Sequence, residues 1–290
     1  MNPHKINYES MGTHWEITIW DKLNKERLAE LEGKIVKNSV NFDKTYSRFK
    51  INSLVTKISG QKGTIKVPAD FTKMLNMYID LYKLSEKTIS PLVGQALSEM
   101  GYDPAYSMIA KGKIKKVPDL LRSVSIVDST HIKTKKPLLF DFGALGKGYF
   151  VDKIAQYLKK EGVKRFLVNG SGDIYYHGEQ PIKVGLEHPL DSSKIVGSID
   201  MKTGSMCASA GNRRKWGKVH HIINPNTLKP ACDIVATWVL SDVTALSDAL
   251  ATCLFFVAPE NFEKKYNFEY LILNKEMRVK KSKGFSAELY

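Results

Sequence analysis

The segment from residue 137 to residue 173 constrains the fold more than any other part of the chain. It reads as a buried strand, a glycine-rich turn, an amphipathic helix, a second short strand and a second glycine-rich turn. One face of the helix is supplied by Ile154, Leu158 and either Tyr149 or Phe150, and Gly162 follows the helix as a natural C-terminal cap. Glycines in the turns allow the backbone to approach a ligand closely, so this segment is a candidate binding region.

Strand and helix patterns continue on both sides of this segment without strict alternation. Apolar spacing of three to four residues predicts helices around 28–42, after Pro68 and over 245–258. Short apolar or alternating runs predict strands around 15–19, 123–127, 137–142, 166–168, 182–188, 234–242 and 270–274. This mixture indicates an α+β fold rather than a doubly wound sheet. Because no repeat or linker divides the chain, we expect residues 1–290 to form a single domain.

Composition narrows the classes of function. Lysine and arginine total 44 against 30 acidic residues, a net charge of +14 that favours anionic partners such as nucleotides. No zinc finger, RNP pattern or long basic block is present, so we do not expect a nucleic-acid partner. No apolar run approaches the roughly 20 residues that span a bilayer. With no visible signal segment and three cysteines without CxxC spacing, we expect a cytoplasmic protein, although a trimmed lipoprotein signal would leave no trace.

Two glycine-rich turns are candidate anion sites. The turn from Asp141 to Gly148 opens a helix, whose N-terminal N–H groups attract anions, and Lys147 adds a charge suited to a pyrophosphate. Its spacing is neither a Rossmann fingerprint nor a P-loop. The turn at 169–173 could form a backbone nest for an anion. Either segment could equally be an ordinary tight connection.

Asp248 and Thr252 are four residues apart on a predicted helix, so their side chains share one face. A carboxylate and a hydroxyl are hard oxygen donors that suit Mg²⁺, with phosphate oxygens, water or a backbone carbonyl completing the shell. The alternative is an acid that stabilises a helix dipole beside a threonine that bonds to its own helix. His221, near the turn at Pro225, could act as a general base or have only a structural role.

Taken together and in this order, the motifs resemble the ApbE family, the FAD:protein FMN transferases. The family's signatures are matched by MGTHW (11–15), YSRFKINS (46–53), DFGALGKG (141–148), VNGSGDI (168–174), ASAGN (208–212), HIINP (221–225) and SDALATCLF (247–255). Each motif alone is weak, but seven in the correct order span nearly the whole chain.

The resemblance implies an FAD site in a cleft between two subdomains of an ApbE-like domain. Such enzymes cleave FAD, release AMP and join FMN through its phosphate to a threonine or serine hydroxyl of an acceptor flavoprotein. Carried over to this sequence, the metal ligands for Mg²⁺ would be Asp248, Thr252 and the carbonyl of Ala144. The FAD contacts would be Met11, Asp141, Lys147 and Ile223. His221 would be the base or orienter for the acceptor hydroxyl, with Asp248 the second catalytic residue.

Some positions depart from the family pattern. Asn224 and Asn212 replace usual acids, Ala210 replaces a usual serine, and the segment 85–103 lacks the glycine and aromatic residue that precede its proline. Two alternatives therefore stay open. One is an FAD pyrophosphatase that hydrolyses FAD to FMN and AMP, and the other is a non-catalytic flavin-binding protein.

Overall fold

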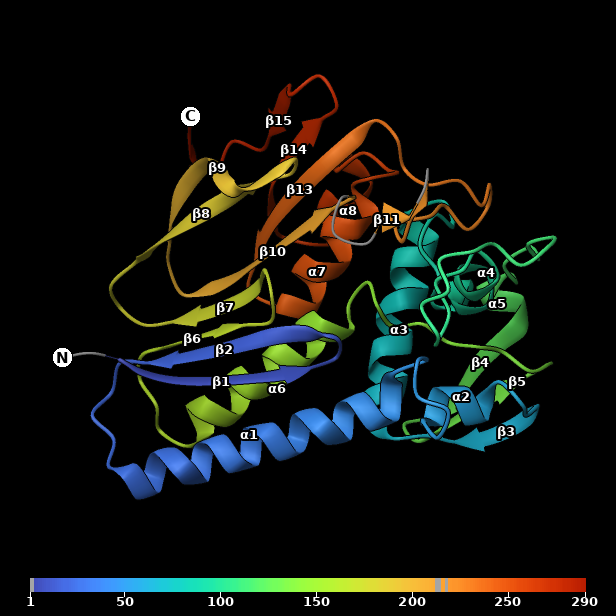
Figure 1. Ribbon diagram of the computed structural model, residues 1–290, viewed down its shortest axis with the longest axis horizontal. Coiled ribbons are helices and arrows are strands. Elements are labelled where there is room, and N and C mark those ends of the chain that lie inside the picture. The colour runs from blue at the N-terminus through green and yellow to red at the C-terminus, as the bar shows by residue number, and fades with distance from the viewer. Residues whose placement is uncertain (1–2, 212–214, 217–218) are drawn as a thin grey trace.

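The computed structural model describes residues 3–211, 215–216 and 219–290 (Figure 1). Its largest sheet has the strand order β1-β2-β6-β7-β10-β13-β14-β15, and every neighbouring pair is antiparallel. The strands are β1 (His4–Ser10), β2 (Thr13–Ile19), β6 (Phe166–Asn169), β7 (Asp173–His177), β10 (Gly204–Ala210), β13 (Ile234–Ser241), β14 (Glu269–Asn274) and β15 (Val279–Lys281). We call this the main sheet.

The main sheet is covered on both faces. On one face lie the helices α1 (Lys25–Tyr46), α6 (Gly146–Lys160) and α7 (Thr244–Cys253). On the other lies a small sheet of β8 (Ile182–His188), β9 (Asp191–Met201) and β16 (Glu288–Leu289). Strand β13 illustrates the burial of both faces of the main sheet, because successive side chains of a strand point to opposite faces. Val239 belongs to the core under the helices, and its neighbour Trp238 belongs to the core under the small sheet.

The remaining elements form a second region beside the main sheet, on the right in Figure 1. Helix α3 (Ala69–Leu84) lies against a sheet of order β3-β5-β4. The sheet and its neighbouring helices are β3 (Gly63–Lys66), β4 (Val124–Asp128), β5 (His131–Thr134), α2 (Leu54–Ile58), η1 (Pro91–Val93), α4 (Gly94–Glu99) and α5 (Leu120–Ser123). Helix α8 (Glu260–Glu263) and the pair β11 (Lys215–Trp216) and β12 (Val219–His220) complete the described elements.

The mixture of helices and antiparallel sheets confirms the α+β fold class. Most predicted elements are present, including the α3 stripe, in which Phe71, Met74 and Leu75 are fully buried. In the described part of the chain, none of the helices combines the length and the apolar character that crossing a bilayer requires.

One predicted strand is absent and one predicted helix is too long. The run 137–142 forms no strand: its alternate residues Leu138 and Phe140 are buried, but no strand of the described chain pairs with it. The predicted helix over 245–258 ends at Cys253 and continues as turns. After Cys253 the N–H groups of Phe255 and Phe256 donate to carbonyl oxygens three residues earlier, so the α-helical hydrogen-bond pattern is not continued.

Helices α6 and α7 contact each other through reciprocal hydrogen bonds. The Asp152 carboxylate of α6 accepts from the backbone N–H groups of Thr244 and Ala245, each at 2.9 Å, at the start of α7. In return, the Asp248 carboxylate of α7 accepts from the N–H of Gly148 at 3.0 Å, in the first turn of α6. Each helix thus supplies a carboxylate that accepts from N–H groups in the first turn of the other helix, where N–H groups have no partner within their own helix.

Gly148 permits this approach because it has no side chain. A Cβ at this position would lie 2.4 Å from the Thr244 carbonyl oxygen and 2.8 Å from the Asp248 Cβ. The sequence interpretation assigned this glycine to ligand approach, together with Gly143 and Gly146. The structure instead places Gly148 between two helices, where close packing explains it.

We expect Gly148→Ala to destabilise the fold by about 1–3 kcal/mol, because the added methyl group overpacks the contact between α6 and α7. Thermal or denaturant unfolding measures this change. Gly33→Ala on α1 is the matched control, since a Cβ there meets nothing within 4 Å. It should leave stability unchanged or raise it by about 0.5–1 kcal/mol. Equal effects of both substitutions would contradict the packing explanation.

Candidate active site

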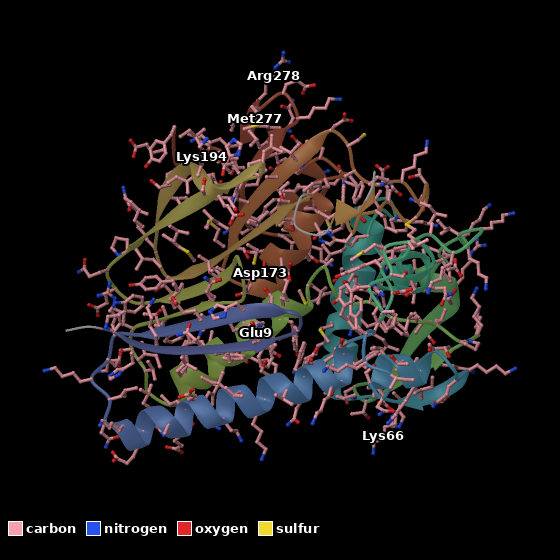
Figure 2. The ribbon with its side chains drawn as sticks, in the orientation of Figure 1. Glu9, Lys66, Asp173, Lys194, Met277 and Arg278 are labelled. Atoms are coloured by element: carbon pink, nitrogen blue, oxygen red, sulfur yellow. The ribbon has the colours of Figure 1, made fainter. Side chains whose placement is uncertain are left out.

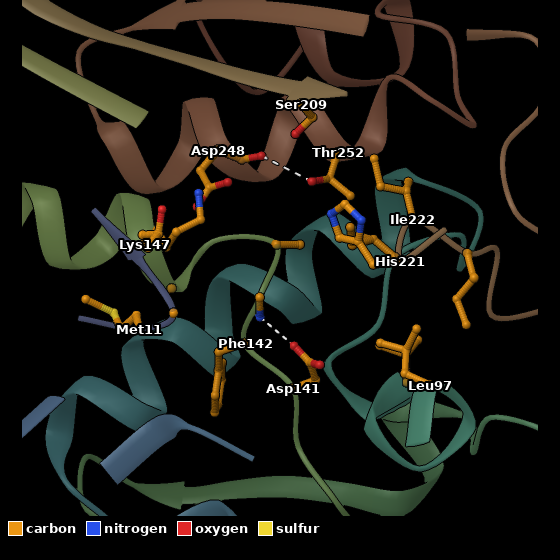
Figure 3. Close-up of a pocket in the computed structure, with 18 of the residues that line it drawn as sticks. Met11, Leu97, Asp141, Phe142, Lys147, Ser209, His221, Ile222, Asp248 and Thr252 are labelled. Carbon is orange, nitrogen blue, oxygen red and sulfur yellow. Dashed lines mark hydrogen bonds between the residues drawn. The ribbon is translucent and has the colours of Figure 1, made fainter. Parts of the chain in front are cut away.

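A cavity of about 390 Å³ lies between the main sheet and the α3 region. Its lining comes from hairpin turns of the main sheet, the first turn of α6 and one face of α7 on one side, and from residues 42–49 and 88–102 on the other. All eight residues that the sequence singled out line it: Met11, Asp141, Ala144, Lys147, His221, Ile223, Asp248 and Thr252. Figure 3 shows six of these around one space. The expected cleft between two subdomains is therefore present.

Asp248 and Thr252 lie on the same face of α7, directed at the cavity (Figure 3). Asp248 is 4% exposed, and its carboxylate accepts from the Gly148 N–H. The sequence left open that this acid stabilises the start of a helix. It does so for α6, however, and not for α7, the helix to which it belongs. The Thr252 hydroxyl donates a long hydrogen bond of 3.5 Å to the Asp248 carbonyl oxygen. The Asp248 carboxylate and the Thr252 hydroxyl thus border the cavity and also form these hydrogen bonds.

The turn from Asp141 to Ala144 is held by a residue that the sequence analysis did not single out. One carboxylate oxygen of Asp141 accepts from the Gly143 N–H at 2.7 Å, and the other accepts from Arg48 Nε at 2.5 Å. Arg48 is 4% exposed and also donates to the Tyr102 carbonyl at 2.7 Å. Its signal in the sequence was the YSRF motif at 46–49, used only as a family marker.

Lys147 is held by a second unforeseen partner. Its ammonium group pairs with the carboxylate of Asp173, the first residue of β7. Asp173 is 1% exposed and lies in the middle of the fold, whereas Lys194 and Arg278 lie at its edges (Figure 2). Because a buried carboxylate needs a counter-charge, Asp173 fixes the Lys147 ammonium beside the cavity.

The second glycine-rich turn also borders the cavity. Ser171 and Gly172 have positive φ angles of 62° and 98°, and both line the cavity. The Asn169 side chain stabilises this turn by accepting from the Gly172 N–H at 3.0 Å. The segment is thus a tight turn placed at a candidate ligand site, which combines the two interpretations that its sequence allowed.

The loop after β12 carries His221 and Ile223 to the cavity wall. Ile223 is buried and packs with Leu97 and Tyr102, which also line the cavity. Residues of the segment 85–103 therefore form an apolar wall even without the family's usual aromatic residue. Figure 3 shows His221 and Thr252 among the residues that line the cavity.

The structure gives a different result for each position that departs from the family pattern. The Asn224 side chain accepts from the Asn226 N–H at 2.9 Å, a turn contact that an aspartate or an asparagine can make. Ala210, at the end of β10, lines the cavity. Asn212 lies outside the described residues.

We expect Asp173→Ala to destabilise the fold by about 2–3 kcal/mol, because it removes the buried carboxylate that pairs with the Lys147 ammonium. Denaturant unfolding measures the change. Asp233→Ala is the control: Asp233 pairs with Lys275 at 2.9 Å on the surface, with a side chain 74% exposed, and its loss should cost less than about 1 kcal/mol. A similar cost for both variants would contradict a special role for the buried pair.

Comparison with known proteins gives one consistent result. The model of the ApbE family matches residues 11–270. A Rhodobacter capsulatus protein named FAD:protein FMN transferase is 26% identical over 215 residues, which cover 69% of this chain but 41% of that protein. The Escherichia coli (strain K12) protein of the same name is 23% identical over 274 residues, covering 87% of this chain and 78% of that protein.

Two solved structures share the fold. The ApbE protein from Thermotoga maritima has a TM-score of 0.86 at 19% identity, and the flavin transferase ApbE from Vibrio cholerae has a TM-score of 0.82 at 19% identity. Each alignment covers 98% of this chain and 98% of the other chain. The match to the family model covers most of the sequence, and its motifs meet at one cavity. The chain belongs to the ApbE family.

Proposed function

We propose that this chain is an FAD:protein FMN transferase. It binds FAD in the cavity, transfers the FMN part to a threonine or serine hydroxyl of an acceptor flavoprotein, and releases AMP. The observation that carries the proposal is the meeting of Asp248 and Thr252 from α7 with the Ala144 turn and Lys147 at one cavity. Family membership and the names of the relatives support it. Because that cavity takes residues from both sides, we also propose that residues 1–290 act as one domain.

The donor set fits Mg²⁺. Asp248 would supply a carboxylate oxygen, Thr252 a hydroxyl oxygen and Ala144 a backbone carbonyl oxygen, all hard donors that Mg²⁺ prefers. Among the described residues, no N–H group donates to the Ala144 carbonyl oxygen, which leaves it available to a cation. No group of three or more His, Cys, Asp or Glu side chains there could hold a metal by itself, so phosphate oxygens and water would complete the shell. When bound, the ion would neutralise charge on the pyrophosphate.

The chain's own residues would bind and orient FAD. The Lys147 ammonium group and the positive end of the α6 dipole favour the pyrophosphate anion. The carboxylate of Asp141 can accept hydrogen bonds from FAD, while Met11 and Ile223 offer apolar contacts at the cavity wall. Fixing the donor in this way lowers the entropic cost of the transfer step.

His221 would remove the proton from the acceptor hydroxyl, since an imidazole with a reference pKa of about 6.5 suits proton removal near neutrality. The hydroxyl oxygen then attacks the FMN phosphorus, the bond to the bridging oxygen breaks, and AMP leaves. In the pyrophosphatase alternative, water would take the place of the acceptor hydroxyl. In the alternative of a non-catalytic flavin-binding protein, FAD would bind and remain intact.

We expect Asp248→Asn to lower FMN transfer at least about 100-fold, because the amide loses the negative charge that holds the cation. The amide oxygen can still accept from Gly148, so cooperative unfolding should persist. Mass spectrometry of an acceptor incubated with FAD and Mg²⁺ measures transfer as an added FMN phosphoester. Asp242→Ala, an exposed acid two residues before α7, should behave like the unmodified chain. Undiminished transfer by Asp248→Asn would remove the metal assignment.

Chelation tests the metal requirement separately. EDTA should abolish transfer, and added Mg²⁺ should restore it, because the bound cation would neutralise the negative charge of the two phosphates. The products distinguish the alternatives: flavin covalently attached to the acceptor supports transfer, free FMN alone supports a pyrophosphatase, and intact FAD supports a non-catalytic protein. Full transfer in the presence of EDTA would contradict the proposal.

A further inference from the structure

Tyr78 is a buried residue of α3 whose hydroxyl group, among the described residues, forms its hydrogen bonds with the turn that begins at Asp141. The side chain is 1% exposed and borders the cavity, and its ring packs on Phe142 with the ring centroids 5.9 Å apart. The hydroxyl donates to the Asp141 carbonyl oxygen at 3.4 Å and accepts from the Ala144 N–H at 3.3 Å. A single hydroxyl group thus bridges both ends of the turn.

A phenol hydroxyl can donate one hydrogen bond and accept another at the same time. The two contacts with the Asp141 carbonyl oxygen and the Ala144 N–H use both of these capacities.

The bridge bears directly on where the Ala144 carbonyl points. The peptide unit before Ala144 is fixed by the hydrogen bond from its N–H to Tyr78. The unit after it is fixed because the Leu145 N–H donates to the Phe142 carbonyl oxygen at 3.2 Å. In a planar trans peptide, the C=O points away from the N–H, so the Ala144 carbonyl is directed away from Phe142. Removing the Tyr78 hydroxyl releases one of these two constraints.

Arg48 holds the same turn at a different point. It contacts the carboxylate of Asp141, whereas Tyr78 contacts backbone groups at Asp141 and Ala144. The side chain that would face FAD and the carbonyl that would face the cation are thus supported by separate residues. This separation allows the contribution of Tyr78 to be measured by itself.

We infer that Tyr78 is a positioning residue that orients the Ala144 carbonyl for the divalent cation. The inference rests on the proposed metal site and adds a residue to it. Tyr78 would touch neither the cation nor the substrate; it would act through the turn. Outer partners that orient metal ligands typically change metal affinity by about 10–100-fold when they are removed.

The test is Tyr78→Phe, which removes one oxygen and keeps the ring packed. Mn²⁺ serves as the probe, and its binding is measured by electron paramagnetic resonance without FAD or acceptor. We expect the affinity for Mn²⁺ to fall about tenfold. In FMN transfer, the Mg²⁺ concentration for half-maximal rate should rise by a similar factor, while the KM for FAD at saturating Mg²⁺ should change little.

Tyr82→Phe is the matched control. Tyr82 lies one helical turn further along α3, is also buried, and its hydroxyl accepts from the Leu120 N–H at 3.4 Å without bordering the cavity. It loses a comparable hydrogen bond, so it should lower stability without changing Mn²⁺ affinity. If Tyr78→Phe behaves like Tyr82→Phe, the role of Tyr78 is purely structural and the inference is wrong.

A second comparison separates this inference from the proposed function. If Asp248→Asn binds Mn²⁺ as tightly as the unmodified chain, the metal site itself fails, and the inference fails with it. If Asp248→Asn loses Mn²⁺ binding but Tyr78→Phe retains full affinity, only the role of Tyr78 is overturned.

Discussion

The contact between Gly148 and Asp248 is the interaction on which the site depends. One carboxylate accepts from the first turn of α6 and faces the cavity from α7, so the two helices and the candidate metal site are fixed together. The reciprocal contact from Asp152 to the start of α7 sets the position of that helix. With no Cβ at position 148, the helix backbones approach closely enough for both contacts.

The second constraint is a turn held from the opposite side of the cavity. Tyr78 on α3 and Arg48 just after α1 bind the segment that starts at Asp141, which has no strand partner of its own. Their burial makes the turn rigid where a short irregular segment would otherwise be free to move. The cavity is therefore bordered by groups whose positions are set before any ligand arrives, which is what a transfer reaction requires of its site.

The sequence was informative where a pattern is local and less so where partners are distant. The helix spacing of Asp248 and Thr252 placed both on one face, as the structure shows. In contrast, the partnership of Arg48 with Asp141 joins positions 93 residues apart, and no periodicity encodes it. The sequence likewise does not indicate that Lys147 pairs with Asp173, although both residues lie in motifs that resemble those of the family.

Errors in the sequence interpretation have the same origin. The run 137–142 has the alternation of a strand, but a strand also needs a ladder of hydrogen bonds to a second strand, and none of the described strands pairs with this run. The sequence pattern assigned Gly148 to close approach of a ligand. Its actual role, close packing against α7, depends on the tertiary structure and leaves no local pattern in the sequence. The order of the seven motifs supplied the family and the cavity residues; the contacts that hold those residues required coordinates.

In the function proposed here, a divalent cation would be held between the paired oxygens of α7 and the turn after Asp141, next to the phosphates of FAD. A crystal structure with FAD and Mn²⁺, with anomalous diffraction from the metal, tests this proposal most directly. We expect an anomalous peak at bonding distance, about 2.0–2.3 Å, from oxygens of Asp248 and Ala144 and from an FAD phosphate. A peak elsewhere, or FAD bound outside this cavity, would contradict it.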